Sequence, residues 1–251
     1  TALLFGKVQS GKTISSIALS ALALDNGYAN IIVLTSNVSL LQEQTASDFE
    51  IFLPKCLHID EPNNRNKTKI GRKLKKIKDE PVTFVIKKNS TSLDLLGTVF
   101  DPKFGNIRST LPTLILDDEG DQASLKTDAK AGRRSIYKLT ERFRDSLDVE
   151  SLVTVTATPF ANLLLDEGKS DHLYPTIIQT LEPGEGYTGA KVFFREESEN
   201  VIRNVSYHEK QRMSRVDGIK DLPDGFKRSV IYHLLSAAYR REKGIEGKHT
   251  M

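Results

Sequence analysis

An eight-residue segment near the N-terminus, Gly6–Thr13, constrains this chain more than any other feature. It has the pattern G-x-x-x-x-G-K-T. The apolar run before it, Ala2–Phe5, predicts a short buried strand, and Thr13–Leu19 after it predicts a helix. In this setting the N–H groups of the loop and the start of the helix converge on an anionic phosphate. The segment therefore predicts a protein that binds a nucleoside triphosphate.

Two side chains of this loop have expected roles of their own. We expect the Lys12 ammonium to contact the β- and γ-phosphates and the Thr13 hydroxyl to bind Mg²⁺. The loop as a whole is expected to hold the nucleotide, through Gly6, Lys7, Val8, Gln9, Ser10, Gly11, Lys12 and Thr13.

Further apolar runs predict a sheet behind this loop. Strands are expected at Ile31–Thr35, Val82–Ile86, Leu114–Leu116 and Leu152–Thr156. Asn26-Gly27 is a plausible stop for the first helix, and Ser39 opens the next one. Short buried strands separated by helices predict an α/β fold, a parallel sheet with helices on both faces. Ligands of such sheets bind at the carboxyl ends of the strands, where the polar motifs of this chain lie.

The pattern weakens after Pro159. We expect a first domain over residues 1–180, an irregular extension over 181–227, and a helix over 228–251 that leads toward a further domain. One strand candidate, Lys191–Phe194, lies in the extension. Because the chain begins at Thr1, inside the run expected to form a central strand, we expect it to be a piece of a longer protein.

The composition excludes several classes of protein. A single cysteine, Cys56, excludes an internal disulfide and a cysteine-rich zinc site. The longest apolar stretch, Ile14–Leu24, is too short to cross a bilayer, and no targeting segment is visible at the N-terminus. We therefore expect a cytoplasmic protein with no membrane partner.

Positive charge is concentrated in two stretches, Arg65–Lys78 and Lys126–Arg144, although the net charge is only +3. In the first stretch Ile70, Leu74 and Ile77 recur at helical spacing, which predicts an amphipathic helix with a basic outer face. Such a face is either simply solvated or contacts the backbone of a nucleic acid.

An acidic string, Asp117–Asp121, follows the strand expected at Leu114–Leu116. An ATPase needs one carboxylate to hold Mg²⁺ and a neighbouring one to orient or deprotonate the attacking water. We assign Asp118 to the metal and Glu119 to the water. The alternative, in which Asp117 serves the metal, stays open at this point.

The strand expected at Leu152–Thr156 ends in Thr156-Ala157-Thr158-Pro159. After a phosphate loop and an Asp-Glu strand, Thr156 and Thr158 are expected to sense the γ-phosphate and to report it to a partner domain. Proline then stops strand pairing.

In this order the three motifs resemble a superfamily-two helicase-type ATPase, and more narrowly the Z-one domain family of prokaryotic proteins linked to restriction and DNA defence. The resemblance spans nearly the whole chain. Its residues are Gly6–Thr13, Leu41–Thr45, Ile86–Asn89, Asp117–Ser124, Thr156–Asn162 and the segment from Leu222-Pro223 to Arg241.

The resemblance implies the first RecA-like domain of a motor that uses ATP and Mg²⁺, with the TATP strand between the phosphate-loop strand and the Asp-Glu strand. Lys12, Thr13, Asp118 and Glu119 inherit nucleotide and hydrolytic roles by direct motif match. Asp121, Thr156 and Thr158 inherit coupling roles, and Gln9 is a loop residue of the family. These residues are all present in the chain.

A motor of this kind closes its site with an arginine from a second RecA-like domain. That domain is expected to begin where this chain ends, and Arg240 and Arg241 are poor substitutes because they lie on a predicted helix. We therefore expect the isolated chain to bind nucleotide and to hydrolyse it slowly.

Two functions use such a site. The first is a nucleic-acid-dependent ATPase that moves on or remodels a nucleic acid, with DNA as the expected partner. The alternative is a nucleotide-gated switch that recruits an effector nuclease without travelling along DNA. The sequence has no separate carboxylate–lysine cluster for nuclease chemistry, and a small-molecule phosphotransferase would need an acceptor pocket that the sequence does not reveal.

Overall fold

The computed structural model describes residues 1–77, 80–101, 107–121, 136–164, 173–196, 206–213 and 223–244. The chain divides into two compact units, Thr1–Tyr187 and Thr188–Met251. The first unit holds the sheet and the candidate site.

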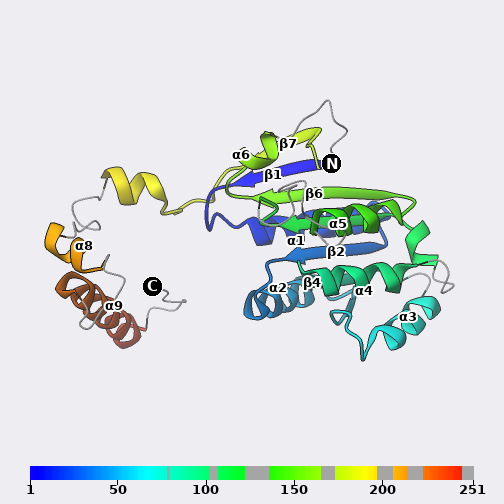
Figure 1. Ribbon diagram of the computed structural model, residues 1–251, viewed down its shortest axis with the longest axis horizontal. Coiled ribbons are helices and arrows are strands. Elements are labelled where there is room, and N and C mark those ends of the chain that lie inside the picture. The colour runs from blue at the N-terminus through cyan, green and yellow to red at the C-terminus, as the bar shows by residue number, and fades with distance from the viewer. Residues whose placement is uncertain are drawn as a thin grey trace. The chain divides into compact units, whose positions relative to one another are not determined.

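A seven-stranded parallel sheet forms the centre of the first unit, in the order β3-β4-β2-β5-β6-β1-β7 (Figure 1). The strands are β1 (Ala2–Gly6), β2 (Asn30–Thr35), β3 (Leu57–Ile59), β4 (Val82–Lys87), β5 (Thr113–Asp118), β6 (Glu150–Thr156) and β7 (Ile177–Leu181). This arrangement, of the Rossmann or RecA-like kind, confirms the predicted α/β fold class. It also places β6, which carries the TATP residues, between β1 and β5, the order that the resemblance implies.

Helices cover both faces of this sheet. They are α1 (Lys12–Asp25), α2 (Ser39–Phe52), α3 (Lys67–Lys76), α4 (Ser90–Phe100), η2 (Ile107–Thr110), α5 (Ile136–Asp145) and α6 (Phe160–Leu163). Successive residues of a strand point to opposite faces. Ile31 of β2 therefore packs in the core with α1 and α2, while Ile32 packs in the core with α3, α4 and α5. Such a strand, buried on both sides, is continuously apolar, as the sequence of β2 indicates.

The four predicted strands behind the loop are confirmed, and two further strands were not predicted. β3 has only three residues, and β7 is an edge strand whose side chains are mostly exposed, so neither carries the continuous apolar run of a central strand.

The strand predicted at Lys191–Phe194 is wrong, because Val192–Glu196 forms a π-helical turn (η4). The other described elements of the second unit, α8 (Tyr207–Met213) and α9 (Asp224–Glu242), are also helices. With no described strand beside it, the segment satisfies its backbone groups within a helical turn. None of the helices that the structure describes has the length and apolar character that a bilayer crossing requires.

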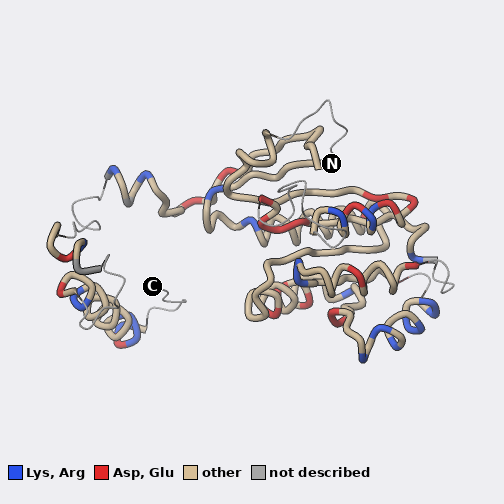
Figure 2. The backbone as a smooth tube through the Cα atoms, viewed as in Figure 1, with Lys and Arg blue, Asp and Glu red and all other residues tan. Residues whose placement is uncertain are grey.

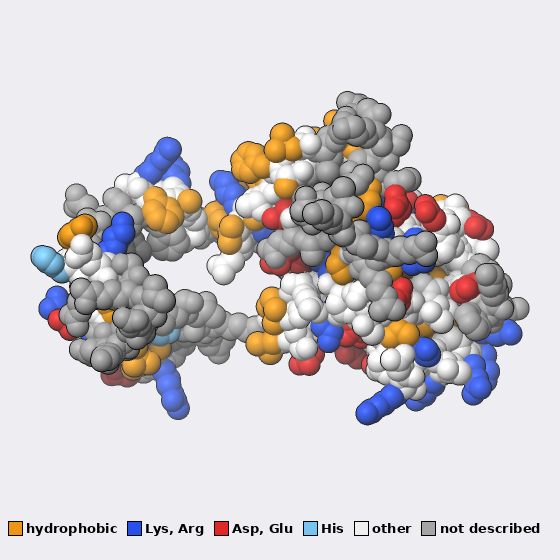
Figure 3. All heavy atoms as spheres, viewed as in Figure 1, with side chains coloured by type: hydrophobic (Ala, Val, Ile, Leu, Met, Phe, Trp, Pro, Cys, Tyr) orange, Lys and Arg blue, Asp and Glu red, His pale blue; other side chains and the backbone are white. Residues whose placement is uncertain are grey.

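The amphipathic basic helix is confirmed as α3, which buries Ile70 and Leu74 and leaves its Lys and Arg side chains outside. Basic side chains gather around α3 (Figures 2 and 3). In the second basic stretch, residues 126–135 lie outside the described residues, as do Lys78 of the first stretch and Gln122–Ser124 of the acidic string.

A buried arginine, Arg108, ties together the amino-terminal edge of the sheet. Its side chain is fully buried. One terminal nitrogen donates to the Ala29 carbonyl at 3.2 Å, and the other donates to the carbonyls of Ile77 (3.1 Å) and Glu80. Asn30 at the start of β2 returns a bond to the Arg108 carbonyl at 3.0 Å. One side chain thus joins η2 to the chain segments that enter β2 and β4.

Replacing Arg108 by Met should destabilise the first unit by about 3–5 kcal/mol, because three partly buried carbonyls lose their donor. Urea unfolding followed by circular dichroism measures this loss. Arg65→Met, at an exposed arginine, is the control and should stay within about 0.5 kcal/mol of the parent. Equal stabilities of the two variants would show that Arg108 does not anchor this edge.

Candidate functional site

The phosphate-loop segment turns sharply between β1 and α1. Gln9 and Gly11 both have positive φ angles, 56° and 92°. The Ser10 N–H donates to the Lys7 carbonyl at 3.2 Å, and the Lys12 ammonium folds back to the same carbonyl at 3.0 Å. The charge of Lys12, the first residue of α1, therefore lies against the loop.

Several features of this loop would suit a bound anion. A Cβ on Gly6 would lie 2.9 Å from Ser10 Oγ and 3.0 Å from Lys12 Cγ, so glycine is needed there for close packing. Ser10 Oγ is buried and has no hydrogen-bond partner in the described structure. The N-cap of α1 is Gly11, which offers no side chain to the free N–H groups of the first turn, and that turn contains no acidic residue. These groups fit an anion held by the loop.

Tyr187, at the end of the first unit, braces the loop from outside. Its hydroxyl donates to the Val8 carbonyl at 2.7 Å, and the Lys7 ammonium lies 5.9 Å from the centre of its ring. The sequence did not single out Tyr187, because nothing local links it to a loop almost 180 residues earlier.

The three carboxylates at the end of β5 have different surroundings. Asp117 is buried, and its Oδ1 lies 3.0 Å from the ammonium of Lys88, which is also buried. The Lys88 ammonium donates in addition to the carbonyls of Asp118 (2.6 Å) and Glu119 (2.9 Å). Asp117 is thus engaged in a structural ion pair. From the sequence, Lys88 belongs to the resemblance segment Ile86–Asn89 but has no role of its own, since a lysine after a strand is usually solvated.

Asp118 and Glu119 are only partly buried. Burial raises the pKa of Asp118, and the neighbouring Glu119 charge adds to that rise against the opposing effect of Lys88. A cation beside Asp118 would favour the charged carboxylate and so offset both effects. Among the described residues no three acidic, His or Cys side chains form a metal-binding group. A metal held by this pair would have to take its other ligands from phosphate and water.

A left-handed residue and a crowded glycine fix the turn after these carboxylates. Glu119 has a φ of 52°. A Cβ on Gly120 would lie 2.3 Å from Thr154 Cγ2 on the adjacent strand β6, a distance that no side chain can occupy. The turn therefore sits directly against β6.

Asp121 joins this turn to the TATP residues. The Thr156 hydroxyl donates to one carboxylate oxygen of Asp121 at 2.7 Å, and the Thr158 hydroxyl donates to the other at 2.5 Å. Burial works against ionisation of Asp121, but the hydroxyls of Thr158 and Thr156 outweigh it and hold the pKa of Asp121 below its ordinary value. The two threonines are thus linked directly to the Asp-Glu turn.

Strand order brings the predicted residues to one edge of the sheet. Phe5 of β1 pairs with Thr156 of β6, and Asp118 of β5 pairs with Val155 of β6. The phosphate loop, the TATP residues and the acidic turn therefore leave three adjacent strands at the same end. Arg240 and Arg241 lie on α9 in the second unit.

In a comparison with known proteins, no family model matches the chain, and no curated protein matches it.

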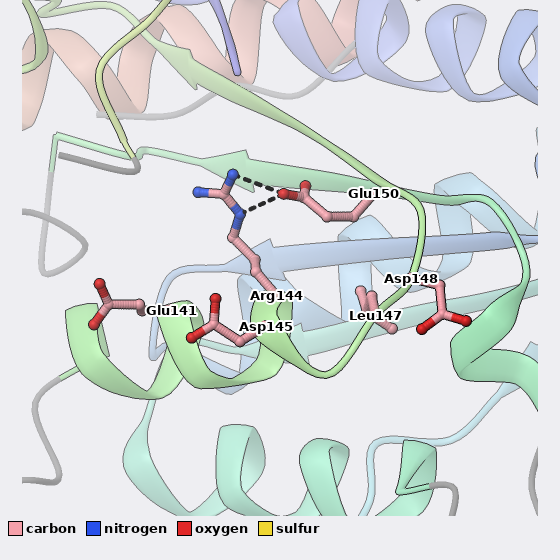
Figure 4. A pocket seen from close by; sticks show the side chains of 6 residues that line it. All are labelled: Glu141, Arg144, Asp145, Leu147, Asp148 and Glu150. Atoms are coloured by element: carbon pink, nitrogen blue, oxygen red, sulfur yellow. Dashed lines mark hydrogen bonds and ion pairs between the residues drawn. The ribbon is translucent and has the colours of Figure 1, made fainter. Parts of the chain in front are cut away.

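A second cluster of acidic residues lies at the opposite edge, where α5 ends and β6 begins. It lines a hollow of about 320 Å³ (Figure 4). Arg144 points to Glu150 there and donates to its Oε1 from two nitrogens, at 3.0 and 2.7 Å. Glu141, Asp145 and Asp148 point in different directions, so the hollow does not assemble a cation site.

Removing both members of the Lys88–Asp117 pair should destabilise the protein less than the sum of the two single removals. Lys88→Met and Asp117→Leu each leave a buried charge without its partner, at a cost of about 3–5 kcal/mol. The double variant should lose clearly less than the sum, and a double-mutant cycle from urea unfolding measures the difference. Strictly additive losses would contradict a direct interaction.

Proposed function

We propose that this chain is the ATP-binding domain of a helicase-like, nucleic-acid-dependent ATPase that serves DNA restriction or phage defence. One observation carries the proposal. A loop suited to a phosphate, a pair of partly buried carboxylates and two threonines bonded to the acidic turn leave three adjacent strands at one edge. The defence setting rests on the resemblance to the Z-one domain family.

In the proposed reaction, water attacks the γ-phosphate of ATP in line with the departing ADP. The loop N–H groups and Lys12 hold the phosphates and stabilise the charge that develops there. Thr13 and Asp118 would hold Mg²⁺, which supplies electrostatic stabilisation of the phosphate oxygens when bound. Glu119 orients the attacking water and accepts its proton.

The surroundings of the acidic string favour Asp118 over Asp117 as the metal-side carboxylate. Asp117 is buried against Lys88, with the ammonium 3.0 Å away, whereas the Asp118 side chain is partly exposed. A magnesium role for Asp117 would require this ion pair to open, and breaking a buried pair is costly.

Asp121 is proposed as the link between hydrolysis and movement. Because its two oxygens accept from Thr156 and Thr158, a shift of the acidic turn on loss of the γ-phosphate would move the end of β6 as well. The response would pass through α6 to a second RecA-like domain outside this chain, which we propose supplies the arginine of the complete site. The isolated chain should therefore hydrolyse ATP slowly. We place the protein in the cytoplasm because it carries one cysteine and this nucleotide chemistry.

Two substitutions separate nucleotide binding from hydrolysis. Lys12→Ala should weaken ATP binding itself at least about tenfold, because it removes a charge from the phosphates. Glu119→Gln should keep ATP affinity and reduce turnover by about 100-fold or more. Calorimetric titration with ATP and Mg²⁺ and single-turnover hydrolysis measure the two effects. Unchanged affinity of Lys12→Ala would contradict the phosphate-loop role, and full turnover of Glu119→Gln would contradict the role of Glu119.

Stimulation by nucleic acid tests the partner. The turnover of the chain, alone and joined to the proposed second RecA-like domain, is measured with and without single- and double-stranded DNA. We expect DNA to raise the rate of the joined form at least several-fold. A rate indifferent to DNA would contradict the motor, and ATP-dependent association with another protein would then favour the alternative, a nucleotide-gated switch.

A further inference from the structure

A groove on the flank of the first unit is lined by positive charge and by a helical glycine. It lies between α3 and α4, has a volume of about 360 Å³, and is lined by Lys67, Thr68, Gly71, Arg72, Lys75, Thr98 and Val99. α3 lies at the end of the sheet opposite the arrowheads of the strands in Figure 1, away from the phosphate loop. The groove is therefore separate from the candidate nucleotide site.

Within the described residues, the cations of α3 have no acidic partner. This ten-residue helix contains six cations and no acidic residue, and none of the six forms an ion pair within the described parts of the chain. Several of the cations are three or four residues apart, for example Lys69 with Lys73 and Arg72 with Lys75, a spacing at which like charges destabilise a helix. An anion from outside the chain would remove this repulsion.

Gly71 is a second, independent sign that something approaches the helix closely. Glycine inside a helix is destabilising relative to alanine, because it loses more conformational freedom on folding. Nothing lies within 4 Å of a Cβ built on Gly71, so internal packing does not require glycine. Its surroundings are open toward the groove that it lines. A ligand that rests on the helix backbone there would require a residue without a side chain, as glycine is.

We propose that this groove binds the phosphate backbone of a nucleic acid, over Gly71 and between Lys67, Arg72 and Lys75. The three cations span nine residues, about 12 Å along the helix, and a duplex presents several phosphates over that length. An anionic membrane is a poorer fit, because Ile70 and Leu74 are buried and leave α3 no apolar face to insert. Binding here needs neither ATP nor the phosphate loop, so the proposal does not rest on the proposed function.

The chain offers matched controls for both features. Lys69, Lys73 and Lys76 are exposed on the same helix but do not line the groove. Gly97 is a helical glycine of α4 whose Cβ would also meet nothing within 4 Å. Gly97 lines a neighbouring hollow between α4 and α5 that carries charges of both signs.

The experiment is fluorescence anisotropy with a labelled 20-base-pair DNA duplex, over a series of salt concentrations and without nucleotide. Reversing the three groove cations to Glu should reduce affinity at least about tenfold and lower the salt-dependence slope by about 3. Reversing Lys69, Lys73 and Lys76 changes the net charge equally and should cost clearly less. Equal losses in the two triple variants would overturn the groove as the site.

Alanine at each glycine gives the sharper outcome. Gly71→Ala should raise the melting temperature by about 2–4 °C and yet weaken DNA binding, whereas Gly97→Ala should raise it similarly and leave binding unchanged. Gly71→Ala with full DNA affinity would overturn the proposal. So would tighter binding of polyglutamate, or of vesicles with anionic headgroups, than of DNA at matched charge. Lys12→Ala should bind the duplex like the parent, which keeps this test separate from that of ATP binding.

Discussion

The buried ammonium of Lys88 is the interaction on which the candidate site depends. Its backbone N–H donates to Thr35 at the end of β2, and its side chain crosses to the end of β5, where it meets Asp117 and the carbonyls of Asp118 and Glu119. One residue directly after β4 thus fixes the ends of two further strands. The same charge holds the carbonyls of Asp118 and Glu119. This anchor therefore supports the left-handed turn at Glu119.

Buried cations hold the sheet at both of its edges. Arg108 gathers carbonyls at the amino-terminal edge, and Lys88 gathers two carbonyls and a carboxylate at the carboxyl-terminal edge. Each is acceptable away from water only because several acceptors surround it. Arg108 and Lys88 differ in the residues beside them. Next to Lys88 two carboxylates stay partly exposed, so this edge combines a rigid base with groups able to meet a ligand.

The sequence predicts most of the sheet because each central strand is a continuous apolar run, as Ile31–Leu34 is. It does not predict β7, whose exposed isoleucines resemble a loop, and it wrongly predicts a strand at Lys191–Phe194, where a short apolar run is helical. The loop and the acidic string are visible because their spacing is local. The roles of Lys88 and Tyr187 cannot be recognised from the sequence, because their partners lie about 30 and 180 residues away in the chain.

The crowding at Gly120 has an evolutionary consequence. Its missing side chain is excluded chiefly by a methyl group of Thr154, 2.3 Å from where a Cβ would be. A lineage that placed alanine in the acidic turn would first have to lose that methyl group, for instance through serine on the neighbouring strand. We therefore expect Gly120 and Thr154, which are 34 residues apart in the sequence, to be substituted together. Their joint variation would record the contact between turn and strand in any set of descendants.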